Sequence, residues 1–178
     1  MQTAFADDSI GIVGPLSNAA NLQSIPSISR TGDNTAINKL PDGMSVEDIN
    51  NLCENWSKEY DYPIVPFVHG FCLGVKREVI NRIGSFDEEN FAKGFGEETD
   101  YCLRACESGL NCVIAIDTYV FHAKSKSYAV NTRKELMRST YQVLAQKHSM
   151  EKLEFVHDAL KDNPILKKMR KKAFKFLV

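Results

Sequence analysis

The sequence that decides the fold spans residues 86–122 and reads FDEENFAKGFGEETDYCLRACESGLNCVIAIDTYVFH. Gly94 and Gly96 allow backbone conformations that residues with a Cβ seldom adopt. A sharp turn is therefore expected just before the consecutive acids Glu97 and Glu98. The stretch predicts a glycine-punctuated acidic loop that leads into a short helix.

Helical spacing begins at Glu98, where Asp100 and Arg104 lie one turn apart and Gly109 suits the end of the helix. Free backbone N–H groups and the helix dipole favour ionised acids at a helix start. We therefore expect Glu97 or Glu98 to be a charged acceptor at neutral pH. The same residues also admit a plainer interpretation, in which a solvated acidic loop caps a helix.

The apolar run at residues 111–116 predicts a buried strand, Asp117-Thr118 a turn, and residues 119–122 a second short strand that ends at His122. A single histidine at a strand end is more often structural than a ligand.

Elsewhere, apolar periodicity predicts elements of both kinds. A strand at 9–13 should end at Gly14-Pro15, and one or two strands should lie within 64–75. Residues 24–43 read as a long surface loop. Helices are expected at 45–60, where Ser45 and Asp48 suit a capped start, and at 76–83, 133–148 and 150–160.

A series of short motifs runs in order along residues 9–150: GIVGPLSN at 11–18, QSIP at 23–26, GFC at 70–72, IGSFDE at 83–88, GEETD at 96–100, RA at 104–105, YVFH at 119–122 and SY at 127–128. The series resembles the carboxyl-terminal half of inverting family 2 glycosyltransferases with the GT-A fold. The likeness is strongest to the rhamnosyltransferase-like branch that builds bacterial surface polysaccharides.

The resemblance implies an α/β fold: a partial GT-A, Rossmann-like domain with a mixed sheet flanked by helices and with helices at its carboxyl end. Residues 1–150 would form the acceptor and catalytic half of that domain. Residues 151–178 would form a helical extension with a basic tail.

By the same resemblance, the activity is transfer of a sugar, with inversion, from a nucleotide-sugar donor to a glycan or lipid-linked acceptor. Glu98 matches the catalytic base, and Glu97 and Asp100 would shape or orient the site. The family often has Glu-Asp where this chain has Glu97-Glu98.

His122 matches a histidine that completes the shell of a divalent metal, Mn or Mg, in related enzymes; alternatively it is a strand-end histidine bonded to Asp117 or to backbone. The residues expected to line the sugar or acceptor site are Ser17, Asn18, Gly70 and Gly96. Ser17 and Asn18 have an alternative role as the cap of a short helical turn at residues 18–22.

In the resembled family an amino-terminal half holds the sugar nucleotide and carries an Asp-x-Asp motif for the metal. This sequence contains no Asp-x-Asp, and Asp7-Asp8 falls in the segment that normally follows it. We therefore expect a fragment, or a truncated or split enzyme, that is inactive in isolation. The alternative function is a catalytically inactive glycan-binding or assembly module.

Composition is ordinary for a globular domain, with 43% hydrophobic and 25% charged residues among 178. The sequence has no apolar run near the ~20 residues of a membrane span, no signal-peptide pattern and no nucleic-acid-binding motif. A cytoplasmic protein is expected. Its five cysteines form no CxxC pair, so reduced thiols are expected.

The carboxyl-terminal tail carries six basic residues and no acid after Pro164. On a helix its apolar residues share one face, which suits a segment that lies on anionic lipid at the inner face of the membrane. The alternative is a tail that packs back on the acidic body or remains solvated. The apolar residues concerned are Leu166, Met169, Ala173, Phe176 and Leu177.

Overall fold

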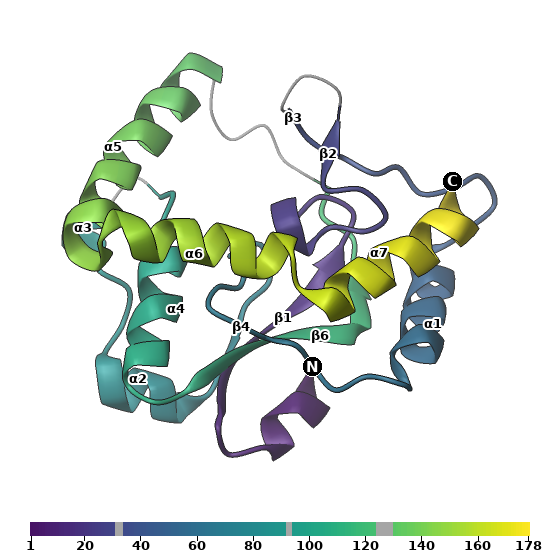
Figure 1. The fold of residues 1–178 in the computed structure, drawn as a ribbon, viewed down its shortest axis with the longest axis horizontal. Coiled ribbons are helices and arrows are strands. Elements are labelled where there is room, and N and C mark those ends of the chain that lie inside the picture. Colours follow the sequence, from purple (N-terminus) through teal and green to yellow (C-terminus); the bar gives the residue numbers. More distant parts are fainter. Residues whose placement is uncertain (31–33, 92–93, 124–129) are drawn as a thin grey trace.

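The computed structural model describes residues 1–30, 34–91, 94–123 and 130–178. The chain forms a four-stranded mixed sheet flanked by helices, which confirms the α/β class (Figure 1). The SY motif at 127–128 lies outside the described residues.

Two long parallel strands form the centre of the sheet. β1 (Ile10–Ser17) pairs with β6 (Asn111–Val120) along its whole length. Two short strands flank them in antiparallel orientation, so the order is β4-β6-β1-β5, with β4 at Ile64–Val65 and β5 at Gly74–Val75. Because β1 and β6 end together, the residues that follow them meet at one edge of the sheet.

The predicted end of β1 at Gly14-Pro15 is wrong, because the strand continues to Ser17. β5 pairs with β1 at Ile12 and Val13, before the proline. Pro15 has no backbone N–H to donate, but β5 does not pair with β1 at that position. No hydrogen bond between these two strands is therefore lost. The Pro15 carbonyl accepts a hydrogen bond from the side chain of Gln23, so the strand stays extended.

The predicted turn at Asp117-Thr118 is also wrong, because β6 runs through it. Pro15 pairs with Ala115 but Leu16 pairs with Tyr119, so the extra residues form a bulge. Asp117 is held there by the hydroxyl of Tyr62, whose oxygen lies 2.5 Å from its carboxylate.

The predicted helices are present with shifted ends. α1 (Val46–Ser57) starts with the expected capping box between Ser45 and Asp48. The others are α2 (Arg77–Ile83), α4 (Glu97–Glu107), α5 (Val130–His148) and α6 (Met150–Lys161). A four-residue helix, α3 (Glu88–Phe91), was not predicted.

The segment predicted as a long loop, residues 24–43, is partly structured. It contains the paired strands β2 (Ser29–Arg30) and β3 (Asn34–Thr35), and Ile25 and Ala36 are buried. The 3-10 helix before it, η2, spans Asn21–Gln23, so a helical turn starting at residue 18 is not formed.

The two faces of the sheet are covered by different elements. Ile12, Ile114 and Ile116 face the main core, whereas Val13 and Val113 pack under the amino-terminal 3-10 helix η1 (Gln2–Ala6). In Figure 1, α6 and α7 (Pro164–Leu177) cross the front of the sheet. Leu160 of α6 belongs to the main core, so the carboxyl-terminal helices complete it.

The basic tail forms α7, as its amphipathic pattern predicts, but most of its apolar face is covered, and only Phe176 of that face is exposed. Leu166, Met169 and Ala173 are buried in the main core. The Arg170 guanidinium donates to the carbonyl oxygens of Leu22, Leu160 and Lys161. This is the packing that the alternative interpretation of the tail predicts. Within the described part of the chain, no helix combines the length and apolar character needed to cross a membrane.

Candidate functional site

The loop before α4 has an unusual backbone. Gly94, Phe95 and Gly96 all have positive φ, at +77°, +68° and +94°. A left-handed conformation costs a non-glycine residue such as Phe95 roughly 1–2 kcal/mol. A Cβ on Gly96 would lie 2.3 Å from Cγ2 of Thr140 on α5, so the glycine is required by contact as well as by φ.

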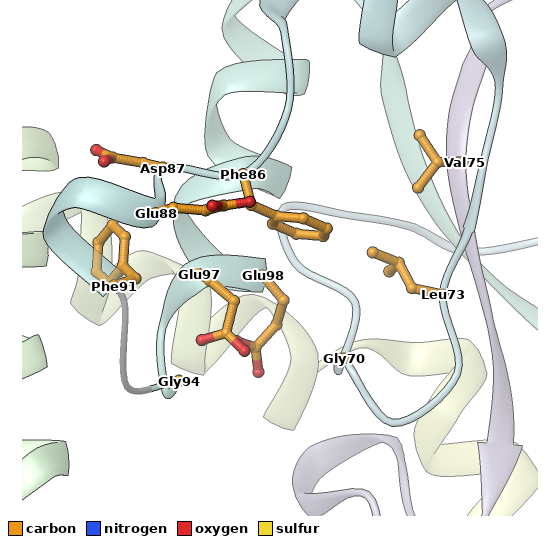
Figure 2. A pocket seen from close by; sticks show the side chains of 10 residues that line it. All are labelled: Gly70, Leu73, Val75, Phe86, Asp87, Glu88, Phe91, Gly94, Glu97 and Glu98. Atoms are coloured by element: carbon orange, nitrogen blue, oxygen red, sulfur yellow. The ribbon is translucent and has the colours of Figure 1, made fainter.

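A cavity of about 700 Å³ opens beside this loop, between the start of α4 and the segment that leads to β5. Figure 2 shows the side chains of Glu97 and Glu98 extending in the same direction from the start of α4, with Gly70 on the facing loop. The lining residues are Gly70, Leu73, Val75, Phe86, Asp87, Glu88, Phe91, Gly94, Glu97 and Glu98.

Glu98 is a half-buried acid at the wall of the cavity. Its Oε2 accepts a hydrogen bond from the N–H of Gly96 at 3.2 Å. Burial raises the pKa of Glu98, and the neighbouring charge of Glu97 raises it further, against the opposing effect of nearby backbone amides that include that of Gly70. Glu98 is therefore a stronger proton acceptor when ionised than an ordinary exposed glutamate.

Glu97 differs from its neighbour. Its Oε2 is buried and has no hydrogen-bond partner within the described ranges. A buried oxygen without a donor is costly. A hydroxyl that enters the cavity could supply one.

Asp100, expected at the site, does not line the cavity. It is fully buried and bonded to three basic side chains: Arg104 Nε at 2.7 Å, His148 Nε2 at 2.8 Å and Lys147 Nζ at 2.9 Å. Lys147 and His148 are the last residues of α5, so their bonds to Asp100 hold α4 against α5. The predicted pairing of Asp100 with Arg104 is present.

Lys147 also binds Asp87, whose Oδ2 lies 2.5 Å from its Nζ. In Figure 2 the Asp87 carboxylate points away from the other acids of the cavity. Glu88, Glu97 and Glu98 are thus the lining acids left for a ligand.

Ser17 and Asn18 lie where β1 and β6 end, and they are bonded to protein groups. The Asn18 side chain accepts from the His122 N–H at 2.7 Å and donates to the His122 carbonyl at 3.2 Å. Ser17 Oγ donates to Asn18 Oδ1 at 3.2 Å. Both residues are buried, and they fix the backbone at His122.

The His122 ring is held by backbone, as the structural interpretation predicts. Its Nδ1 lies 2.9 Å from the carbonyl oxygen of Ala19. The ring stacks on Phe71 with centroids 5.2 Å apart and lies 6.5 Å from the ring of His69. Since Gly70 contacts Glu98, the three-residue segment 69–71 connects His122 to the acidic cavity.

The structure thus brings Glu97, Glu98, Gly70 and Gly96 together. His122 stacks on Phe71, the residue that follows Gly70. Sequence reasoning missed Phe86 and Phe91 as cavity walls, although both belong to the stretch that decides the fold. It also missed Lys147, because nothing in the pattern of α5 marks it as the partner of Asp87.

A divalent metal remains an expectation from the resemblance. In the part of the chain that the structure describes, no three His, Cys, Asp or Glu side chains gather as a metal site would require.

Comparison of the chain with protein-family models, with curated proteins and with solved structures found no match.

Proposed function

We propose that this chain is the acceptor-binding and catalytic part of an inverting glycosyltransferase. It transfers a sugar from a nucleotide-sugar donor to a glycan or lipid-linked acceptor in bacterial cell-surface polysaccharide synthesis. The motif series supports this family. The observation that carries the proposal is Glu98, a half-buried acid of raised pKa at the wall of a cavity large enough for a sugar unit.

The chemistry requires a base in that position. The acceptor hydroxyl must lose its proton as its oxygen attacks the anomeric carbon of the donor, and a base is most effective when its pKa lies near the working pH. Burial moves the pKa of Glu98 in that direction. Its carboxylate accepts the proton, while the N–H of Gly96 keeps one of its oxygens in place.

The walls of the cavity favour a neutral acceptor. Glu88, Glu97 and Glu98 can accept hydrogen bonds from sugar hydroxyls, and Phe86 and Phe91 offer apolar surface. The lining residues include no Lys, Arg or His among those that the structure describes, so an anionic group would meet uncompensated negative charge.

The sugar-nucleotide donor and the metal would be bound by residues other than those that line the cavity. In the resembled family, residues outside the matched motifs hold the sugar nucleotide. His122 is the candidate metal ligand of this chain: its Nδ1 lies against the Ala19 carbonyl oxygen, so Nε2 is the ring nitrogen left for a metal.

The proposal is tested on the chain itself by NMR titration with neutral methyl hexosides and methyl deoxyhexosides. Amide shifts should change at Gly70, Gly96 and Glu98, and methyl hexuronides should produce smaller changes. Cavity residues that do not respond at millimolar glycoside would contradict the proposal. Binding without transfer, in an enzyme that also binds the donor, would favour the inactive glycan-binding module.

We also propose a peripheral contact between α7 and anionic lipid, as suits an enzyme with a lipid-linked acceptor. Because Leu166, Met169 and Ala173 are buried, the contact would use the outer face of α7. That face carries exposed lysines together with Phe174, which is 57% exposed, and Val178 directly after the helix is 82% exposed. The exposed lysines are Lys167, Lys168, Lys171 and Lys175.

A further inference from the structure

Three cysteines gather where α4 turns back into β6. Cys102 and Cys106 lie one turn apart on α4, and Cys112 is the second residue of β6. The Sγ atoms of Cys106 and Cys112 are 3.8 Å apart. A disulfide holds its sulfurs about 2.05 Å apart, so an approach of about 1.8 Å would join them.

We propose that Cys106 and Cys112 form a reversible oxidation site that reacts with hydrogen peroxide or an organic hydroperoxide to give a disulfide. Cys106 is partly exposed, whereas Cys112 is buried. The oxidant therefore meets Cys106 first, and Cys112 is the resolving thiol.

The surroundings of Cys106 favour its reactive form. The hydrogen bond between the sulfurs of Cys106 and Cys112 outweighs burial and brings the pKa of Cys106 to about 7. Lys152 on α6 attracts the thiolate, while Glu107 on α4 opposes it. The lowered pKa makes the thiolate, which is the nucleophile, more available at Cys106 than at an ordinary cysteine.

The reaction balances without further reagents. The Cys106 thiolate attacks one peroxide oxygen, so that an S–O bond forms, the O–O bond breaks and hydroxide leaves. That hydroxide takes the proton of Cys112, whose sulfur then attacks the Cys106 sulfur. The S–S bond forms, the S–O bond breaks, and the departing hydroxide takes a proton from solvent. In sum, two thiols and one hydrogen peroxide give one disulfide and two waters; with an organic hydroperoxide, an alkoxide leaves in the first step, takes the Cys112 proton, and the products are one disulfide, one alcohol and one water.

The local fold limits the choice of partner. The turn between the two cysteines includes exposed Gly109, whose φ is +85°, and this turn can adjust as the sulfurs approach. Cys102 is fully buried, and its Sγ donates to the Val68 carbonyl oxygen at 3.8 Å. The disulfide should therefore join Cys106 to Cys112 rather than to Cys102.

The experiment treats the folded chain with a few equivalents of hydrogen peroxide, blocks free thiols with N-ethylmaleimide and maps the products by mass spectrometry. Trypsin cleaves after Arg104 and separates Cys102 from the pair, and a glutamate-specific protease cleaves after Glu107 between Cys106 and Cys112. The expected product is residues 105–107 joined to the fragment that begins at residue 108, and dithiothreitol should release it.

Unmodified thiols at both positions, a disulfide to another cysteine, or sulfinic acid at Cys106 as the main product would each overturn the proposal. In Cys112→Ser, peroxide should leave Cys106 as a sulfenic acid that dimedone traps. Cys72→Ala, which removes a cysteine elsewhere, should still form the disulfide. The mass-spectrometric disulfide map of the wild-type chain tests the proposal even if a variant folds poorly.

Discussion

Gly70 lies directly against Glu98: a Cβ on Gly70 would be 3.2 Å from both Cβ and Cγ of Glu98. This contact is tighter than ordinary packing, so an added methyl group must displace the glutamate side chain. Since Glu98 is the proposed base, the contact links the GFC motif at 70–72 to the acidic motif at 96–100.

The first prediction concerns that contact. Gly70→Ala should leave the chain folded but alter the pKa of the Glu98 carboxyl, measured by NMR titration of its side-chain carbon. Gly74→Ala is a matched control, because its Cβ would be 3.2 Å from Met1 Cε and away from the acids. If the two variants leave the Glu98 titration equally unchanged, Gly70 does not position Glu98.

The second prediction concerns Glu98 and stability. Its folded pKa lies above the ordinary value of 4.5, so ionisation is disfavoured in the folded state. The resulting stability is fully present below pH 4.5 and is lost as pH rises through the folded pKa. Relative to wild type, Glu98→Gln should therefore become more stable between pH 4 and pH 8, as measured by urea unfolding. A constant difference across this range would contradict the raised pKa.

The third prediction concerns Glu98 and catalysis. In an enzyme that includes the donor-binding half, Glu98→Gln should lower kcat by roughly 10²-fold or more, the usual scale for a general base. Donor affinity should remain. Glu88→Gln removes an exposed acid from the same cavity and should have a much smaller effect. Unchanged turnover in Glu98→Gln would assign the base elsewhere, with Glu97 the next candidate.

Much of this site was predictable, because its parts are local in sequence. The helix at Glu97–Glu107, the glycines before it and the Asp100–Arg104 pair all follow from spacing within one turn. The strand errors have a different origin. Pro15 is compatible with β1 because the neighbouring strand β5 stops before it, and Asp117-Thr118 is compatible with β6 because a bulge forms there. Both depend on how distant strands pair, which short-range sequence patterns do not show.

The role of Asp100 shows the same limit. Its sequence position beside Glu97 and Glu98 suggests a cavity residue, yet its side chain lies with Lys147 and His148, almost fifty residues later. Helical periodicity places it on a different face from Glu98, but only the packing of α5 identifies that face as buried.

The fourth prediction follows from that burial. Asp100→Asn should destabilise the fold by about 3–5 kcal/mol in denaturant unfolding, because it removes the buried carboxylate that Arg104 and Lys147 share as an ion-pair partner. Burial raises the pKa of Asp100, but its bonds to Lys147, His148 and Arg104 outweigh this, so the pKa is lowered overall. Its contribution should therefore be lost as pH falls below 3.8. Asp162→Asn removes an exposed partner of Lys167 and should change little, so equal losses in both variants would contradict the assignment.

The last prediction concerns the outer face of α7. Truncating the chain at Asn163 would remove Leu166, Met169 and Ala173 from the core, so point variants are the better test. The chain should sediment with vesicles that contain anionic phosphatidylglycerol, remain in solution with phosphatidylcholine alone, and dissociate in high salt.

Lys171→Glu should weaken vesicle binding by roughly 30-fold, since each lysine near an anionic surface contributes about 1 kcal/mol and the variant replaces that attraction with a similar repulsion. Lys39→Glu changes net charge equally at an exposed position far from α7 in sequence and should retain binding. Equal losses in the two variants would indicate attraction through net charge alone. Equal recovery in the supernatant with both lipids would rule out the membrane contact, and α7 would then serve to cover the core.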